Sequence, residues 1–158
     1  MLKEKADQVV HRVIIVSGYF NPIHSGHLDY IEGARKLGDE VIVIVNNDAQ
    51  VALKGSTPFM SEKDRVRIVE ALGDVSEAVL SIDEDETVVK SLEVINAALS
   101  SRSTVVFANG GDRVSDVPEV KFCGEHDIEC VFNVGGEKSE SSSNLLSRVL
   151  TNENGGVQ

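Results

Sequence analysis

The stretch from residue 12 to residue 45 reads RVIIVSGYFNPIHSGHLDYIEGARKLGDEVIVIV, with two apolar runs around an amphipathic segment. The runs, Arg12–Ser17 and Val41–Val45, are rich in β-branched residues and typical of strands that are buried on both faces. A helix is expected between them over residues 26–37, and Gly38 suits the left-handed position that ends a helix. Apolar residues at intervals of three indicate the buried face of this helix: Leu28, Ile31, Ala34 and Leu37. The stretch therefore predicts a βαβ unit with parallel strands.

The same alternation continues along the chain. Further strands are expected at residues 78–82, 104–108 and 129–132, and further helices at residues 61–72, 86–99, 119–126 and 142–150. Ser61 followed by Asp64 resembles a capping box at the start of one of these helices. The sequence therefore predicts a single doubly wound, Rossmann-like α/β domain over residues 1–150, with a five-stranded parallel sheet and helices on both faces. Residues 151–158 are expected to be a flexible tail.

Charge and composition exclude several functional classes. The 158 residues include 15 Lys and Arg against 26 Asp and Glu, a net charge of −11. Such a chain repels the phosphate backbone, so no nucleic-acid partner is expected. The apolar runs are only strand-sized and the start of the chain lacks the apolar core of a secretory signal, so we expect no membrane partner and a cytoplasmic protein. Cys123 and Cys130 are too few for a disulfide framework and are expected to be idle thiols.

Ligands of doubly wound folds bind at the carboxyl ends of the strands, which here means the loops expected at residues 18–27, 46–60 and 109–116. The first loop, GYFNPIHSGH, lacks the glycine patterns of dinucleotide-binding folds and P-loops. Instead, His24 and His27 flank Gly26 at the start of a helix, where amides and the helix dipole attract phosphate. Two alternatives stay open: the histidines only cap the helix, or they bind a metal, for which HxxH without a third ligand is a poor zinc set.

These residues and three later segments resemble one known family. The HSGH of residues 24–27 is similar to the HxGH signature of the nucleotidyltransferase superfamily. The likeness continues through residues 28–49, through LKG at residues 53–55 and through SEKDRVRIVEALGDV at residues 61–75, and ESSSN at residues 140–144 corresponds to a second phosphate motif. Within the superfamily the likeness is to the cytidylyltransferase-like branch, with its glycerol-3-phosphate cytidylyltransferases and heptose-phosphate adenylyltransferase domains. Four motifs in order over residues 12–150 make the likeness specific.

The resemblance implies roles for individual residues. His24 and His27 match histidines that stabilise the transition state at the α-phosphate, and Lys54 matches a lysine that contacts phosphates, so these residues are expected to be catalytic. A solvated loop lysine is the alternative for Lys54, and plain capping is the alternative for the serines of the second phosphate motif. The expected nucleotide-binding residues come from the first loop, from a GGDR segment and from that phosphate motif: Tyr19, Phe20, Asn21, Gly26, Gly111, Asp112, Arg113, Ser141, Ser142 and Ser143. Many relatives carry Asp where this chain has Asn21.

The resemblance also implies a reaction. A phosphate oxygen of the acceptor attacks the α-phosphorus of CTP or ATP and pyrophosphate leaves, with no protein nucleophile. Mg²⁺ is expected to enter with the triphosphate and to have no fixed protein ligands, and the acceptor is expected to be a small phosphorylated alcohol or sugar. A homodimer is expected by resemblance alone. Two alternatives stay open: a nucleotide-binding module without turnover, and an adenylyltransferase that forms a dinucleotide cofactor.

Overall fold

A computed structural model describes residues 11–99, 103–111 and 117–136 of the chain. These residues form a five-stranded sheet in which all pairings are parallel and the strand order is β3-β2-β1-β4-β5. The strands are β1 (His11–Gly18), β2 (Glu40–Val45), β3 (Glu77–Leu80), β4 (Ser103–Gly110) and β5 (Glu129–Val134). The predicted doubly wound, five-stranded α/β fold is therefore confirmed.

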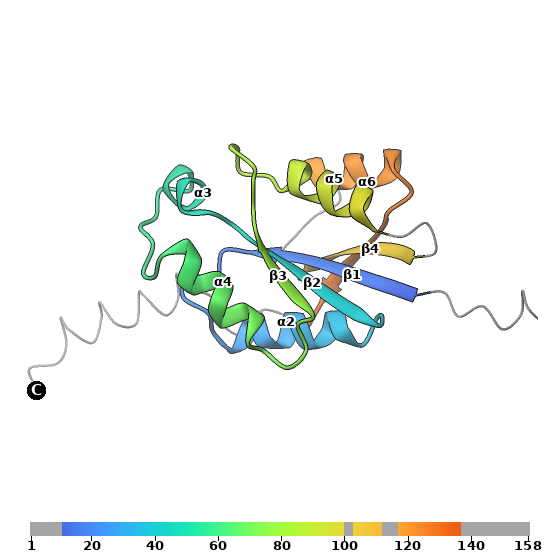
Figure 1. Ribbon diagram of the computed structural model, residues 1–158, viewed down its shortest axis with the longest axis horizontal. Helices are drawn as coiled ribbons and strands as arrows, with labels where there is room; N and C mark the ends of the chain where they lie inside the picture. The colour runs from blue at the N-terminus through green and yellow to red at the C-terminus, as the bar shows by residue number, and fades with distance from the viewer. Residues whose placement is uncertain (1–10, 100–102, 112–116, 137–158) are drawn as a thin grey trace, which may run out of the picture.

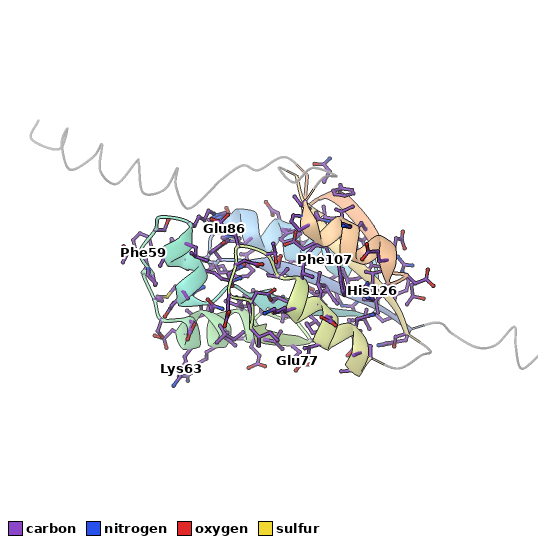
Figure 2. All side chains as sticks on the ribbon, turned by 90° about the horizontal axis from the view of Figure 1, so that it is seen from above. Phe59, Lys63, Glu77, Glu86, Phe107 and His126 are labelled. Carbon is purple, nitrogen blue, oxygen red and sulfur yellow. The ribbon has the colours of Figure 1, made fainter. Side chains whose placement is uncertain are left out.

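Helices cover both faces of this sheet. They are α2 (Ser25–Arg35), α3 (Asp48–Leu53), α4 (Glu62–Glu70), α5 (Val89–Ala98) and α6 (Pro118–Glu125). Figure 1 shows α2 and α4 on one face and α5 and α6 on the other. Ile31 of α2 and Val69 of α4 belong to the first core, whereas Leu92 of α5 and Phe122 of α6 belong to the second. Phe107 of β4 lies in the second core and is almost completely buried (Figure 2).

Strand β1 is the centre of the sheet and the point where the strand order reverses. It pairs with β2 on one side and with β4 on the other. The helix that follows β1 packs in the first core, and the helix that follows β4 packs in the second. The helices that follow β1 and β4 therefore cover opposite faces, which is the arrangement at which doubly wound folds bind ligands.

The structure corrects two local expectations. Residues 46–60, expected to be a loop, contain the helix α3, because Asn47 caps its first turn through the backbone N–H of Gln50. Gly38 is not left-handed, since the described glycines with positive φ are Gly55, Gly135 and Gly136. Glycine is needed at position 38 for another reason: a Cβ atom there would lie 2.8 Å from the carbonyl oxygen of Arg12.

Several expectations fall on other parts of the chain. The helix expected over residues 142–150 and the tail expected over residues 151–158 lie outside the described residues. Among the described helices, none has the length and apolar character that a membrane span requires.

Candidate active site

His24 and His27 form the start of α2, directly after the segment that leaves β1. His24 is the N-cap residue, and its Nδ1 accepts a hydrogen bond from the backbone N–H of Gly26 at 3.1 Å. The Nδ1 atom of His27 accepts from the backbone N–H of His24, also at 3.1 Å. The two rings stack with their centroids 3.9 Å apart. Both histidines therefore cap the helix, which was one of the alternatives that the sequence left open.

These capping bonds determine which ring nitrogen carries the proton. Because each Nδ1 accepts a hydrogen bond, the neutral form of each imidazole carries its proton on Nε2. Each ring is then an Nε2–H donor at the amino end of α2, where backbone amides and the helix dipole also favour an anion. Capping and phosphate binding are thus compatible, since the cap selects the tautomer that can donate to a phosphate oxygen.

Phe20 packs its ring against that of His27. Its side chain is only 1% exposed, and its ring centroid lies 4.8 Å from that of His27. The backbone of Phe20 has a φ of 51°, a left-handed conformation that is uncommon for a residue with a side chain. The ring also packs beneath Gly18, where an added Cβ would lie 2.9 Å from it. The side chain of Phe20 therefore belongs to the core and holds His27 in place, while its expected contact with nucleotide stays a prediction.

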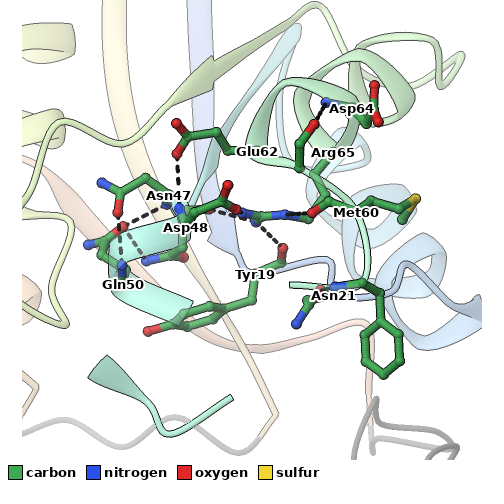
Figure 3. A network of polar contacts seen from close by, with 12 residues as sticks. Tyr19, Asn21, Asn47, Asp48, Gln50, Met60, Glu62, Asp64 and Arg65 are labelled. Atoms are coloured by element: carbon green, nitrogen blue, oxygen red, sulfur yellow. Dashed lines mark hydrogen bonds and ion pairs between the residues drawn. The ribbon is translucent and has the colours of Figure 1, made fainter. Parts of the chain in front are cut away.

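Arg65 of α4 joins the segments that follow β1 and β2. Its side chain is fully buried, and its Nη1 donates to the carbonyl oxygens of Tyr19 at 2.7 Å and Asn46 at 2.6 Å. Its Nη2 pairs with Oδ1 of Asp48 at 2.7 Å, and its Nε donates to the carbonyl of Met60 at 3.2 Å (Figure 3). One guanidinium group therefore holds both turns at the carboxyl end of the sheet.

The buried role of Arg65 was not predicted from the sequence, although a signal for it exists. Arg65 lies four residues before Val69, so both side chains occupy the same face of α4, and both are buried. An arginine on the apolar face of an amphipathic helix is unusual unless its guanidinium group finds several acceptors. Its position in the helical pattern could therefore have marked it as a buried structural residue.

A second polar network surrounds the start of α3. Gln50 is completely buried, and its Nε2 donates to the carbonyl oxygens of Asp85 and Thr87 at 2.8 Å each. Its Oε1 accepts from the backbone N–H of Asn47 at 3.0 Å and from Nδ2 of Asn46 at 3.1 Å. Gln50 therefore ties the turn after β2 to the segment that follows β3.

Lys54 was expected in a loop, but it lies at the C-cap of α3. Its Nζ lies 4.4 Å from the centroid of the Tyr19 ring, within the range of a cation–π interaction. The structure thus brings together two of the expected site residues, one from the turn after β1 and one from the end of α3. Lys54 itself is exposed, whereas Tyr19 is half-buried.

Asn21 holds the segment that leads from α3 to α4. Its Nδ2 donates to the carbonyl oxygen of Thr57 at 3.0 Å, and its Oδ1 accepts from the backbone N–H of Phe59 at 2.7 Å. An aspartate could accept the second of these bonds but could not donate the first. The asparagine that departs from the family pattern therefore has a structural reason in this chain. Its expected contact with nucleotide stays a prediction.

Gly111 lies where the segments that follow β4 and β5 meet. A Cβ at this position would lie 2.6 Å from the carbonyl oxygen of Gly136, a distance that real Cβ atoms do not reach. Glycine is therefore required for the close approach of the two segments. Five other expected binding residues lie outside the described residues, and their roles stay predictions: Asp112, Arg113, Ser141, Ser142 and Ser143.

Two other predictions concern metals and thiols. Within residues 11–99, 103–111 and 117–136, no group of three or more His, Cys, Asp or Glu side chains is arranged to hold a metal ion. Cys123 and Cys130 are free thiols, and burial is the main cause that raises the pKa of each. A raised pKa keeps a thiol protonated and unreactive, which agrees with idle cysteines.

Comparison with known proteins places this geometry in a family. The profile of the cytidylyltransferase-like family matches residues 15–138, a span that contains His24, His27 and Lys54. The chain belongs to this family of nucleotidyltransferases.

Two curated relatives and one solved structure illustrate the likeness. The bifunctional protein HldE of Methylobacillus flagellatus is 38% identical over 107 residues, which make up 66% of this chain and 20% of that protein. The FAD synthase of Ferroglobus placidus is 44% identical over 72 residues, 46% of this chain and 47% of that protein. The chain thus spans from a fifth to about half of these relatives. The lipopolysaccharide core biosynthesis protein of Thermoplasma volcanium shares the fold, with a TM-score of 0.65 at 21% identity, covering 82% of this chain and 99% of that one.

Proposed function

We propose that the protein transfers a nucleoside monophosphate, CMP or AMP, from the magnesium complex of CTP or ATP to a small phosphorylated alcohol or sugar. The observation that supports this most directly is the arrangement of His24 and His27. Both rings use Nδ1 to cap α2, so both carry an Nε2–H at the amino end of that helix. Such donors stabilise the negative charge that develops on phosphate oxygens during transfer.

The proposed reaction is a single displacement. An oxygen of the acceptor phosphate attacks the α-phosphorus, and a new phosphorus–oxygen bond forms as the bond to the β-phosphate oxygen breaks. The electron pair of the broken bond leaves with pyrophosphate, which departs with the magnesium ion. His24 and His27 donate hydrogen bonds to the α-phosphate, and the Lys54 ammonium binds a phosphate of the nucleotide or of the acceptor. Magnesium belongs to the substrate complex because Mg²⁺ commonly binds through substrate phosphates and waters.

A second reaction in the same class has its own support. The FAD synthase of Ferroglobus placidus matches this chain at 44% identity over 72 residues. Under this alternative, the acceptor phosphate belongs to a mononucleotide and the product is a dinucleotide cofactor. The chemistry at the α-phosphate and the roles of His24 and His27 are the same in both cases, so only the acceptor differs.

The test is pyrophosphate release from CTP and from ATP in the presence of Mg²⁺, with three acceptor classes: glycerol 3-phosphate, a heptose phosphate and flavin mononucleotide. Release with one nucleotide and one acceptor identifies the reaction. Calorimetric titration with each magnesium–triphosphate complex runs in parallel. Binding without pyrophosphate release would favour the alternative of a module without turnover, and absence of both would overturn the proposal.

A homodimer is also part of the proposal. It rests on the family resemblance, and Leu80 at the end of the edge strand β3 and Ile82 just beyond it, which are 37% and 58% exposed, would offer apolar side chains to a second copy. Sedimentation equilibrium of the full chain tests this point, and a mass of 17.1 kDa at all concentrations would contradict it.

A further inference from the structure

The pair formed by Tyr19 and Lys54 is not explained by the fold alone. Lys54 is an exposed lysine at the end of a short helix, a position at which a lysine is normally surrounded by water. Its ammonium nevertheless lies over the face of a ring that belongs to another segment, 4.4 Å from the ring centroid. This contact restricts the Lys54 side chain before any ligand binds. Without it, the side chain would be mobile and would lose its conformational freedom on binding.

Tyr19 can hold the lysine because Tyr19 is itself held. Its carbonyl oxygen accepts a hydrogen bond from the buried Arg65, which also binds the turn that leads into α3. The ring therefore lies beside α3 (Figure 3). Tyr19 also immediately precedes Phe20, whose ring packs against that of His27. The segment that carries Tyr19 thus connects the position of Lys54 with that of the histidine pair.

An aromatic partner leaves the charge of the lysine available. The chain has 26 acidic residues against 15 basic ones, so a carboxylate partner would be easy to supply. None of the ion pairs found among the described residues includes Lys54. A carboxylate would neutralise the ammonium, whereas the ring face attracts it without adding a negative charge. The N–H groups that point away from the ring can then still donate to a phosphate.

We propose that Tyr19 is a positioning residue that holds the Lys54 ammonium in place for phosphate binding while leaving its charge uncompensated. This inference rests on the proposed function, because it takes a phosphate of the substrate as the ligand of Lys54. In this role the ring of Tyr19 acts through Lys54. A pre-positioned cation binds more tightly because less conformational entropy is lost on binding.

The first arm of the test measures the pair without any substrate. Protons that lie over an aromatic face resonate upfield, so the CεH₂ signal of Lys54 should be shifted upfield in the wild type. The shift should persist in Tyr19→Phe, which keeps the ring, and disappear in Tyr19→Leu. Lys63, an exposed lysine of α4, is the internal reference (Figure 2). An unchanged Lys54 signal in Tyr19→Leu would overturn the proposal.

The second arm measures calorimetric affinity for magnesium pyrophosphate in a double-mutant cycle. Tyr19→Leu should weaken binding about two- to fivefold, the range expected for an exposed cation–π contact, and Tyr19→Phe should retain most of the affinity. In a Lys54→Met background, Tyr19→Leu should have no further effect. In the matched Lys63→Met background, which removes the same charge elsewhere, the two- to fivefold effect should remain. Thermal unfolding of each variant confirms that it is folded.

The outcomes separate this inference from the proposed function. If the wild type binds pyrophosphate but Tyr19→Leu has the same effect in both lysine backgrounds, the positioning role is wrong and the proposed function stands. If the wild type does not bind pyrophosphate, the phosphate role of Lys54 is wrong and this inference falls, even where the upfield shift is observed. The proposed function is then decided separately by the pyrophosphate-release assay, because it rests on His24 and His27.

Discussion

Helices α2 and α3 follow neighbouring strands of the sheet, and both begin with a reciprocal capping box, but the side chains that build the two boxes differ. In α2 the box consists of His24 and His27, and in α3 it consists of Asn47 and Gln50. In each box the first side chain accepts from a backbone N–H of the first turn, and the second side chain accepts from the backbone N–H of the first residue.

The difference lies in what each side chain can do beyond the cap. Gln50 is completely buried, and its amide nitrogen already donates hydrogen bonds to the carbonyl oxygens of Asp85 and Thr87. An imidazole has a second ring nitrogen on the side opposite Nδ1, and in the capped tautomer that nitrogen is a donor. The same backbone geometry therefore supports a structural junction in α3 and a candidate phosphate site in α2.

The largest effect is expected for Arg65, which joins the turns that lead into the two helices. Arg65→Met would leave the carbonyl oxygens of Tyr19 and Asn46 without their donor and Asp48 without its partner. Leaving a buried acceptor without its donor costs about 1–3 kcal/mol, and the exposed Asp48 carboxylate adds little. With two such acceptors, urea denaturation should show a fall of about 2–5 kcal/mol in the free energy of unfolding. Arg67→Met on the exposed face of the same helix is the matched control. A similar small effect for both variants would contradict the role of Arg65.

The next-largest effect is expected when the capping box of α2 is replaced by the side chains of the α3 box. His24→Asn together with His27→Gln gives α2 the side chains of the α3 box, which preserve the capping acceptors but remove both Nε2–H donors. We expect kcat for pyrophosphate release to fall by roughly 10² or more, with a smaller change in nucleotide affinity, because the donors act mainly in the transition state. The free energy of unfolding should change by less than about 1 kcal/mol, since asparagine is a good N-cap. Equal losses in binding and in kcat would argue against a transition-state role.

A smaller effect is expected when the α3 box is disrupted. Gln50→Leu preserves volume approximately but leaves the carbonyl oxygens of Asp85 and Thr87 without donors. Leaving buried polar groups unsatisfied costs on the order of 2 kcal/mol, which denaturant titration can measure. The kcat of the folded variant should stay within a few-fold of wild type, because Gln50 is a structural residue. A loss of activity as large as that of the histidine variant would show that the two boxes are not functionally distinct.

The smallest effect concerns the segment that Gln50 holds. The side-chain hydrogen bond from Thr87 to Asp85 is the main cause that lowers the pKa of the Asp85 carboxyl below its usual range, and the backbone N–H of Thr87 adds to it. A lowered pKa stabilises the fold above the unfolded-state pKa of about 3.9, and this contribution is lost as pH falls through the folded-state value. Thr87→Val should therefore raise the Asp85 pKa in an NMR titration.

The matching effect of Thr87→Val on stability should be fully present above about pH 4 and should disappear as pH falls through the folded-state pKa of Asp85. It should stay below about 0.5 kcal/mol, because the carboxylate is exposed. A stability difference that grows toward acidic pH would contradict this assignment.

Much of the fold could be predicted because its signals are local. The β-branched runs of β1 and β2 and the loop between β1 and α2 contain their own information on strand, turn and helix start. The predicted apolar face of α2 was only partly correct: Ile31 and Ala34 are buried, whereas Leu28 is 45% exposed. Residues at intervals of three drift around a helix of 3.6 residues per turn, so such a series cannot stay on one face.

The residues of the candidate site also fall into those that local features predicted and those that depend on distant contacts. His24 and His27 were predicted because their spacing and their place before a helix are local features. Asn21 holds residues that lie 36 and 38 positions away, and Arg65 is buried by acceptors that lie 19 and 46 positions away. The contact of Lys54 with the Tyr19 ring depends in turn on the packing of α3. No sequence window contains both partners of such contacts.

The residues alone were sufficient to predict the alternation of strands and helices apart from α3, the parallel sheet and the histidine pair at the start of α2. Each of these follows from periodicity, propensity or spacing over a short span of chain. The tertiary structure was needed to show that the histidines cap the helix through Nδ1, that a buried arginine joins two turns, and that a tyrosine ring holds Lys54. These features arise where strand ends from different parts of the chain converge, and the free energy of burying a polar group there depends on partners that only the folded chain brings within hydrogen-bonding distance.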